Sequence, residues 1–161
     1  MKKLKMFLML TIVGGLLLAG CSNDEPKSVE PTLTPNEMVD EMLAKVEQPM
    51  LMEVTGEQVQ EIYNIDLEKL EDYAIRIPMM NVKTNEIAIL KVKDAADVSA
   101  VEEALKQRAE NVQKQFETYL QDQYENAKNY KLVTKGNYVL FVISDQADEL
   151  VKVYDSFFNE K

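Results

Sequence analysis

The only cysteine of the chain stands in a sequence context that predicts a covalent modification. Leu18-Ala19-Gly20-Cys21 has the pattern of a bacterial lipoprotein processing site. At such a site the thiol receives a diacylglyceryl group, the leader is cleaved, and the cysteine becomes a lipidated N-terminus. We therefore expect residues 1–20 to be a removed leader and Cys21 to anchor the protein at the extracytoplasmic face of the cell membrane.

The residues before Cys21 have the three parts of a secretory leader. Lysines occupy positions 2, 3 and 5, a largely apolar stretch follows, and small residues precede the cysteine. A retained transmembrane helix is the alternative, but a span needs about 20 apolar residues. The apolar stretch from Met6 to Gly20 contains only 15 residues. With Cys21 bound to lipid, no thiol is left for a disulfide, so the fold depends on its core.

The chain is strongly acidic. Removal of the leader, which carries three lysines and no acidic residue, changes the net charge from −10 to −13. Such a charge disfavours nucleic acids and anionic lipid headgroups as partners, whereas a protein or peptide of the cell envelope is compatible with it. Solubility is the simple interpretation of the acidity. Weak surface binding of Ca²⁺ is an alternative, although no D-x-[DN]-x-[DN]-G loop occurs.

The composition excludes several kinds of catalysis. The chain has no histidine, which removes the commonest general base near neutral pH and the commonest zinc ligand. Cys21 is expected to carry lipid, and no P-loop, G-x-S-x-G or G-x-G-x-x-G motif is present. We therefore predict no cofactor, no metal site and no enzyme activity. A carboxylate pair among the 28 acidic residues is the alternative for acid–base catalysis.

Glu86 and Arg108 are the strongest candidates for a functional side-chain pair. Glu86 opens an apolar segment, and Arg108 lies close to the edge of the apolar stripe of a long predicted helix. A planar guanidinium suits a partly buried carboxylate, so we expect an ion pair across the interface between sheet and helix. We interpret the pair as structural, and a small polar binding site between helix and sheet is the alternative.

Aromatic and methionine side chains offer further candidate binding groups. Tyrosines surround a predicted hairpin, where stacked rings could bind a glycan or a peptide. The candidate binding surface there consists of Tyr119, Asn137 and Tyr138. Methionines concentrate in the first half of the mature chain, and we interpret them as core filling, with a peptide groove or a copper(I) site as alternatives. They are Met38, Met42, Met50, Met52, Met79 and Met80.

The N-terminal part of the mature chain predicts a tether followed by two helices. Prolines and polar residues indicate that residues 21–34 are a flexible tether, and residues 35–161 have the length of a single domain. Thr34-Pro35-Asn36-Glu37 has the form of a capping box, ahead of a helix that runs to about Gln48. Thr55-Gly56-Glu57-Gln58 repeats this pattern before a second, short helix.

The remaining periodicity predicts an α+β fold. Its four strands, at residues 73–80, 86–93, 130–134 and 138–144, form two hairpins of an antiparallel sheet. A long helix runs from about residue 97 to 124 between the hairpins, and Asp145 can cap a final helix. The order is therefore α-α-β-β-α-β-β-α. Pro78 indicates that the first strand lies at a sheet edge or near a bulge.

Two predicted strands are apolar on both of their faces. In the strand that starts at Glu86, Ile87 and Ile89 oppose Leu90 and Val92, and the strand from residue 138 shows the same feature. A sheet exposed to water on one face would alternate more clearly. We expect helices on both faces at the centre of the sheet. The alternative is that one face is a binding or self-association surface.

Four stretches, taken together, carry a family resemblance. They are Tyr63-Asn64-Ile65-Asp66, Asn85-Glu86-Ile87-Ala88-Ile89, Arg108 followed by Phe116 and Tyr119, and Gly136-Asn137-Tyr138-Val139-Leu140. With them the chain resembles, from about residue 35 onward, a bacterial lipoprotein family, the domain of unknown function 4358. The resemblance implies exported, lipid-anchored proteins, largely of low-GC Gram-positive bacteria, without an assigned activity or established site residues. It also implies a shared role for Glu86, Arg108, Asn137 and Tyr138.

The sequence as a whole predicts a membrane-tethered, extracytoplasmic binding or accessory module that is not an enzyme. A self-assembling structural lipoprotein and a carboxylate-dependent enzyme of the cell envelope are the alternatives. A shallow groove lined by methionine and tyrosine would favour binding, and a flat exposed apolar sheet face would favour assembly. A deep cleft with two converging acids and no nearby lysine or arginine would favour catalysis.

Overall fold

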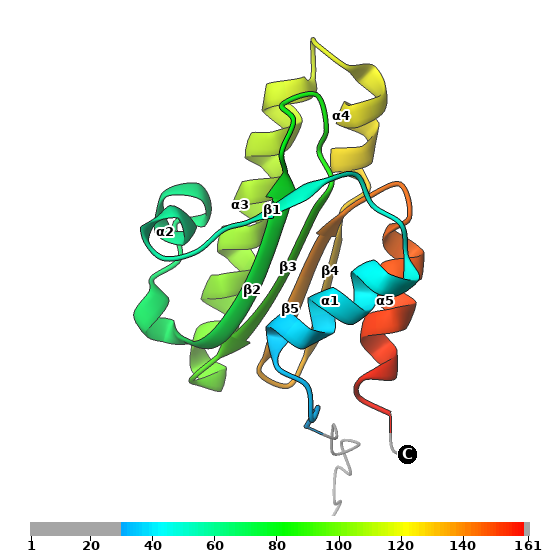
Figure 1. Ribbon diagram of the computed structural model, residues 1–161. Helices are drawn as coiled ribbons and strands as arrows, with labels where there is room; N and C mark the ends of the chain where they lie inside the picture. The colour runs from blue at the N-terminus through cyan, green and yellow to red at the C-terminus, as the bar shows by residue number, and fades with distance from the viewer. Residues whose placement is uncertain (1–29, 160–161) are drawn as a thin grey trace, which may run out of the picture.

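Five antiparallel strands form the sheet at the centre of the molecule (Figure 1). The computed structural model describes residues 30–159, so Cys21 and the predicted leader lie outside the described residues. The strands are ordered β1-β2-β3-β5-β4 across the sheet. Their bounds are β1 Leu51–Glu53, β2 Leu70–Pro78, β3 Glu86–Val92, β4 Lys131–Lys135 and β5 Tyr138–Ile143.

Helices cover both faces of this sheet (Figure 1). One face packs against α2 (Glu57–Tyr63), α3 (Val98–Phe116) and α4 (Gln121–Lys128), and the other packs against α1 (Pro35–Lys45) and α5 (Ala147–Ser156). Short 3₁₀ turns, Leu67–Lys69 and Ala95–Asp97, precede β2 and α3. Within residues 30–159 we find no helix that combines the length and the apolar character needed to cross a bilayer.

The two helical layers explain why the central strands are apolar on both faces. In β3, Ala88, Leu90 and Val92 lie in the core under α3, whereas Ile87 and Ile89 lie in the core under α1 and α5. Successive side chains of a strand point to opposite faces, so one strand supplies both cores. The prediction of helices on both faces is confirmed, and the centre of the sheet offers no open apolar face.

The first helix begins with the predicted capping box, whereas the second helix begins differently. Thr34 Oγ1 accepts a hydrogen bond from Glu37 N at 3.3 Å, and Thr34 N donates to Glu37 Oε2 at 2.8 Å. The helix ends at Lys45, slightly before the predicted end. The cap predicted from Thr55 onward is wrong, because Gly56 precedes α2 with a φ of 61° and no side chain caps the helix. Glycine adopts this backbone conformation without a steric penalty.

The prediction of four strands is wrong, because β1 adds a fifth. Leu51 pairs with Pro78, and Glu53 pairs with Arg76. A strand of three residues is too short to show the alternation by which a strand is recognised in a sequence. The α+β class and the antiparallel arrangement are confirmed.

The position of Pro78 differs from the prediction because β1 occupies the sheet edge. β2 is an inner strand that already begins at Leu70, and its bulge lies between Leu70 and Asp72, far from the proline. Pro78 ends β2 beyond the last pair with β3, which joins Arg76 to Ile87. The missing N–H of the proline therefore removes no hydrogen bond between β2 and β3.

The long predicted helix is in fact two helices. α3 ends at Phe116, α4 begins at Gln121, and Leu120 between them has an extended backbone with φ −134° and ψ 99°. α4 packs against the same core as α3 through Ala127. The spacing of apolar residues along the sequence therefore continues across the break. Periodicity alone therefore did not reveal the break.

Asp145 does not cap the final helix as predicted. Gln146 precedes α5 without a capping side-chain bond of its own. Its backbone N–H donates instead to Ser144 Oγ at 3.0 Å.

Candidate functional site

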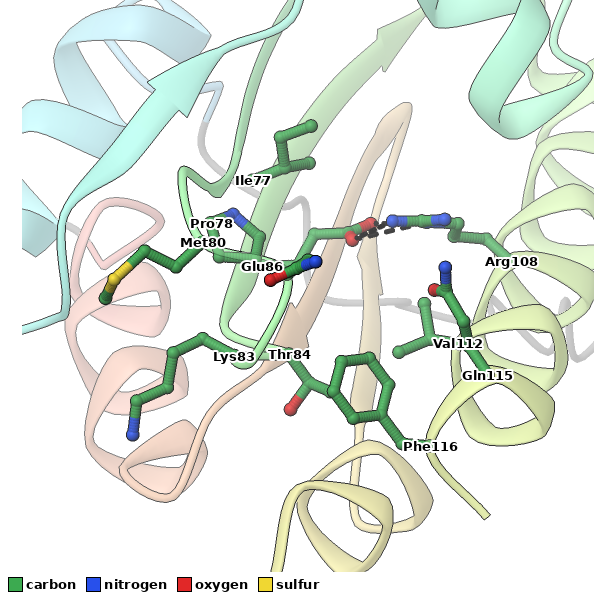
Figure 2. A pocket seen from close by; sticks show the side chains of 11 residues that line it. Ile77, Pro78, Met80, Lys83, Thr84, Glu86, Arg108, Val112, Gln115 and Phe116 are labelled. Carbon is green, nitrogen blue, oxygen red and sulfur yellow. Dashed lines mark hydrogen bonds and ion pairs between the residues drawn. The ribbon is translucent and has the colours of Figure 1, made fainter. Parts of the chain in front are cut away.

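Glu86 and Arg108 meet where the first residue of β3 faces the middle of α3 (Figure 2). Arg108 Nη2 lies 2.7 Å from Glu86 Oε2, and Arg108 Nε lies 3.2 Å from both carboxylate oxygens. The Glu86 side chain is 1% exposed and the Arg108 side chain 19%. The ion pair expected between sheet and helix is therefore present, in the paired geometry that makes arginine–carboxylate contacts strong.

Tyr63 is a third member of this site. Its hydroxyl donates a hydrogen bond to Glu86 Oε1 at 2.6 Å, and the Arg108 guanidinium carbon lies 5.5 Å from the centre of the tyrosine ring. Tyr63 is the last residue of α2, and Asn64 ends that helix with a left-handed φ of 54°. Tyr63 was not among the residues predicted for the site, although it belongs to one of the stretches that carry the family resemblance. Its spacing from Glu86 gives no sign of contact.

The charges within this cluster stabilise one another. Burial raises the pKa of Tyr63 well above its ordinary value, and the negative charge of Glu86 raises it further. Burial acts to lower the pKa of Arg108, but the charge and hydrogen bonds of Glu86 outweigh this effect, so the pKa of Arg108 is raised. Tyr63 therefore stays a hydrogen-bond donor and Arg108 stays charged. The Glu86 carboxylate is thus held by three donor atoms of the protein, the Tyr63 hydroxyl and two guanidinium nitrogens of Arg108.

A pocket of about 140 Å³ opens beside the ion pair (Figure 2). Besides Glu86 and Arg108, its walls come from β2, the loop between β2 and β3, and α3, namely Ile77, Pro78, Met80, Asn81, Lys83, Thr84, Val112, Gln115 and Phe116. The hydrogen bonds of Arg108 to Glu86 use Nε and Nη2, and no hydrogen bond of Nη1 is found within residues 30–159. Pockets for drug-sized ligands measure roughly 300–1,000 Å³, so this one suits a single small group or side chain.

Buried polar residues gather at the same end of the sheet. Thr84 donates to Gln123 Oε1 through its N–H at 3.0 Å and its hydroxyl at 3.1 Å. Asn85 Nδ2 and Ser144 Oγ both donate to Gln48 Oε1, at 3.0 and 2.9 Å. These residues were not predicted to lie together, because they come from separate segments of the chain. The bonds fasten the loop between β2 and β3, which forms one wall of the pocket.

Exposed apolar side chains also lie at this end of the sheet. Within residues 30–159, the large apolar side chains that are most exposed are Met50, Met52, Met79, Met80, Val82 and Tyr119, which we call the apolar patch. Core filling is confirmed for Met38 and Met42, which are fully buried. It is wrong for the four methionines of the patch, because β1 and the loop between β2 and β3 carry them beyond the cover of the helices.

The structure separates the residues predicted to share a binding surface. Tyr119 follows α3 and is 66% exposed. Tyr138 begins β5 and is buried, with its ring centre 5.5 Å from that of Phe158. Asn137 lies in the turn before Tyr138, at the end of the sheet opposite to the ion pair, because Tyr138 pairs with Lys91 at the far end of β3. Tyr119, Asn137 and Tyr138 therefore do not form one surface.

The acidic side chains of the described part of the chain do not gather as metal ligands. No group of three or more side chains that bind metals is close enough to hold an ion within residues 30–159.

Comparison with known proteins identifies the family of the chain. No curated protein and no solved structure matches it. The family model described as Domain of unknown function (DUF4358) matches residues 44–144. This segment contains the five strands of the sheet and the layer of α2, α3 and α4, with Tyr63, Glu86 and Arg108, whereas α1 and α5 lie almost wholly outside it. The chain therefore belongs to the DUF4358 family.

Proposed function

We propose that the protein is a lipid-anchored, extracytoplasmic binding module of the cell envelope, with Cys21 as its lipidated N-terminus and no catalytic activity of its own. One observation carries the binding role. The large apolar side chains left exposed within residues 30–159 lie together at one end of the sheet, beside the pocket at Arg108. Exposed apolar patches on a soluble domain are typical of interaction sites.

The anchor rests on the motif that ends at Cys21. Glu30, the first described residue, follows Cys21 by nine positions. Nine residues span at most about 30 Å when fully extended, so a lipid on Cys21 would hold the domain close to the membrane surface. The net charge of −13 that remains after removal of the leader opposes adhesion to anionic headgroups. Such a domain would therefore stand off the lipid and be free to contact proteins.

The ion pair supports a binding role more than catalysis. Acid–base catalysis by carboxylates needs two acids that converge on a substrate. Glu86 is the only acidic residue among those lining the pocket, where Arg108 and Lys83 accompany it. Its oxygens already accept hydrogen bonds from Tyr63 and Arg108. Self-assembly through an open sheet face is not favoured either, because helices cover both faces at the centre of the sheet.

Substitution of Cys21 tests the anchor. We expect Cys21→Ser to abolish labelling by radioactive fatty acid and to release the protein from membranes or leave its leader uncleaved, because serine cannot form the thioether. The measurements are membrane fractionation and mass spectrometry of the N-terminus. The matched control is Cys21→Ser/Ser22→Cys, which keeps one thiol but moves it by one residue, and we expect it to stay unlabelled. Normal lipid labelling of Cys21→Ser, or an unmodified wild-type chain that starts at Met1, would contradict the proposal.

A further inference from the structure

The apolar patch is continuous along the sheet edge formed by β1. Met79 N donates to Met50 O at 3.1 Å, which places these two exposed residues side by side. Met52 of β1 pairs with Ile77 of β2, and Ile77 lines the pocket. β1 pairs only with β2 within residues 30–159, so its outer edge carries backbone groups that no other described strand uses. An open edge bordered by apolar side chains suits an added strand.

The patch continues from this edge across the pocket to the end of α3. Met80 and Phe116 line the pocket from opposite sides, and the Met80 side chain points outward from it (Figure 2). Tyr119 N donates to Phe116 O at 3.0 Å, which brings Tyr119 to the far rim. Methionine side chains are flexible and polarizable, and they adapt to varied partner side chains. The surface is therefore suited to an extended segment with apolar side chains.

A larger, acidic pocket adjoins this surface. It measures about 450 Å³, and its charged walls are Glu47, Asp122, Asp145 and Lys83. Lys83 also lines the smaller pocket, so the two pockets share a wall. Three acids against one base give the acidic pocket a negative charge. Lysine or arginine side chains next to the apolar segment of a partner would complement that charge.

The chain enters the domain at the opposite end. Glu30 Oε1 lies 3.0 Å from Lys91 Nζ, and Lys91 lies near the end of β3 that is remote from Glu86. The seven residues of β3 extend about 20 Å, at roughly 3.3 Å per residue. The apolar patch therefore lies at the end of the sheet away from Glu30, where the described part of the chain begins (Figure 1). This position and the negative charge of the protein disfavour a membrane surface as the binding partner. A second copy of the chain is disfavoured because its acidic pocket would repel the acidic pocket of the first copy.

We propose that the apolar patch and the acidic pocket together bind an extended polypeptide segment in which apolar side chains stand next to lysine or arginine. The segment adds to the outer edge of β1, its apolar side chains contact the methionines, and its basic side chains enter the acidic pocket. This inference rests on the proposed role of the protein as a tethered binding module and names the chemistry of its partner.

Selection from a library of random peptides of about nine residues, the length of a long strand, tests this inference. The bait is the full chain in phosphatidylcholine vesicles, and peptides that bind empty vesicles are removed first. We expect the selected peptides to be enriched in alternating apolar residues with lysine or arginine beside them. No enrichment, or enrichment without basic residues, would overturn the inference, as would patch-dependent dimers of the full chain in sedimentation.

Two paired substitutions localise the binding. Met50→Ser/Met79→Ser removes apolar side chains that are already exposed, and we expect the Kd of the selected peptides to rise by about tenfold or more. Asp122→Asn/Asp145→Asn removes charge from the acidic pocket, and we expect a rise of about threefold to tenfold that shrinks at high salt. Unchanged Kd values in both variants would overturn the inference. Circular dichroism of each variant checks that the fold is kept.

A control with the same change of charge is available on α3. Glu103 and Glu110 are exposed, with side chains 79% and 60% accessible. Within residues 30–159 their partners lie on the same helix: each forms an ion pair with a lysine, and Glu110 also accepts a hydrogen bond from Gln107. We expect Glu103→Gln/Glu110→Gln to leave the Kd within about twofold, because rim charges far from a contact contribute little. Labelling of Cys21 is measured in the same preparations. Lost labelling with normal peptide binding counts against the anchor alone, and normal labelling without peptide binding counts against this inference alone.

Discussion

The two arginines of the chain lie on opposite faces of the same sheet, and their partners differ. Arg108 meets Glu86, whose side chain is 1% exposed. Arg76 lies 3.7 Å from Asp40 and 3.4 Å from Glu53, whose side chains are 64% and 54% exposed. A buried charge that loses its partner stays desolvated, which destabilises the folded protein, whereas an exposed charge that loses its partner is stabilised by water. The burial of the carboxylate, more than the arginine itself, therefore decides what each ion pair contributes.

The two helical layers differ in the same way. The core under α1 and α5 is formed by apolar and aromatic side chains. The core under α2, α3 and α4 contains the ion pair and Tyr63, and it lies within the segment that the family model matches. The first layer has its ion pair with α1 at the exposed Asp40, whereas the second layer encloses a buried carboxylate together with its charged partner. Substitutions in the two layers should therefore differ in their effect on stability.

Loss of Arg108 should be the most damaging of these changes. We expect Arg108→Leu to lower the free energy of unfolding by about 3–5 kcal/mol, because it removes the opposite charge and leaves buried Glu86 with the Tyr63 hydroxyl as its remaining donor. Urea denaturation at neutral pH measures the change. The variant also keeps an apolar side chain against the α3 core, so lost packing contributes little. A loss below about 1 kcal/mol would show that Glu86 is hydrated in the folded protein.

A double-mutant cycle separates the ion pair from its surroundings. We expect Glu86→Leu/Arg108→Leu to be more stable than Arg108→Leu alone, because the double variant buries no unpaired charge. The coupling energy should be about 2 kcal/mol or more, toward the upper end for residues in contact. The same urea measurements on both single variants complete the cycle. Additive effects would mean that the two side chains act independently.

Removal of the Tyr63 hydroxyl should have an intermediate effect that depends on pH. We expect Tyr63→Phe to lose about 1.5–3 kcal/mol at neutral pH, as for other hydrogen bonds to charged groups. The raised pKa of Tyr63 means that the folded protein keeps a proton that the unfolded chain releases near pH 10. The stability gained from Tyr63 is therefore complete below about pH 10 and is lost as the pH rises above it.

Urea denaturation from pH 7 to 11 measures this dependence. The difference between wild type and Tyr63→Phe should shrink above about pH 10. The matched control is Tyr154→Phe on the other face, where the hydroxyl donates to the Tyr138 carbonyl at 3.3 Å. We expect this control to lose only about 0.5–1.5 kcal/mol at neutral pH, because its acceptor is neutral. Equal losses at the two sites would contradict the idea that the charge of Glu86 strengthens its hydrogen bond with Tyr63.

Substitution of Arg76 should have the smallest effect. We expect Arg76→Leu to lower the free energy of unfolding by about 1 kcal/mol or less, because both acidic partners remain solvated. High salt should reduce the effect further. Thermal and urea denaturation at low and high salt provide the measurement. A loss as large as that of Arg108→Leu would remove the contrast between the two faces.

Local signals predicted much of the fold. The capping box at Thr34 and the two apolar sets of β3 are patterns of neighbouring residues, and the structure reproduces both. The break at Leu120 and the strand Leu51–Glu53 were missed, because no glycine or proline marks the first and the second is too short to alternate. Both are stabilised by contacts with distant elements, which override local propensity.

The candidate site likewise combines features that follow from local sequence patterns with features that depend on contacts between distant segments. The pairing of Glu86 with Arg108 could be predicted from local patterns, since each residue stands in an apolar pattern that turns it toward the core between sheet and helix. The contact of Tyr63 with this pair could be seen only in the folded chain, and so could the division of the methionines between the core and the apolar patch. These outcomes depend on how α2 packs beside α3 and where β1 joins the sheet, and such contacts between distant segments leave no periodic trace in the chain.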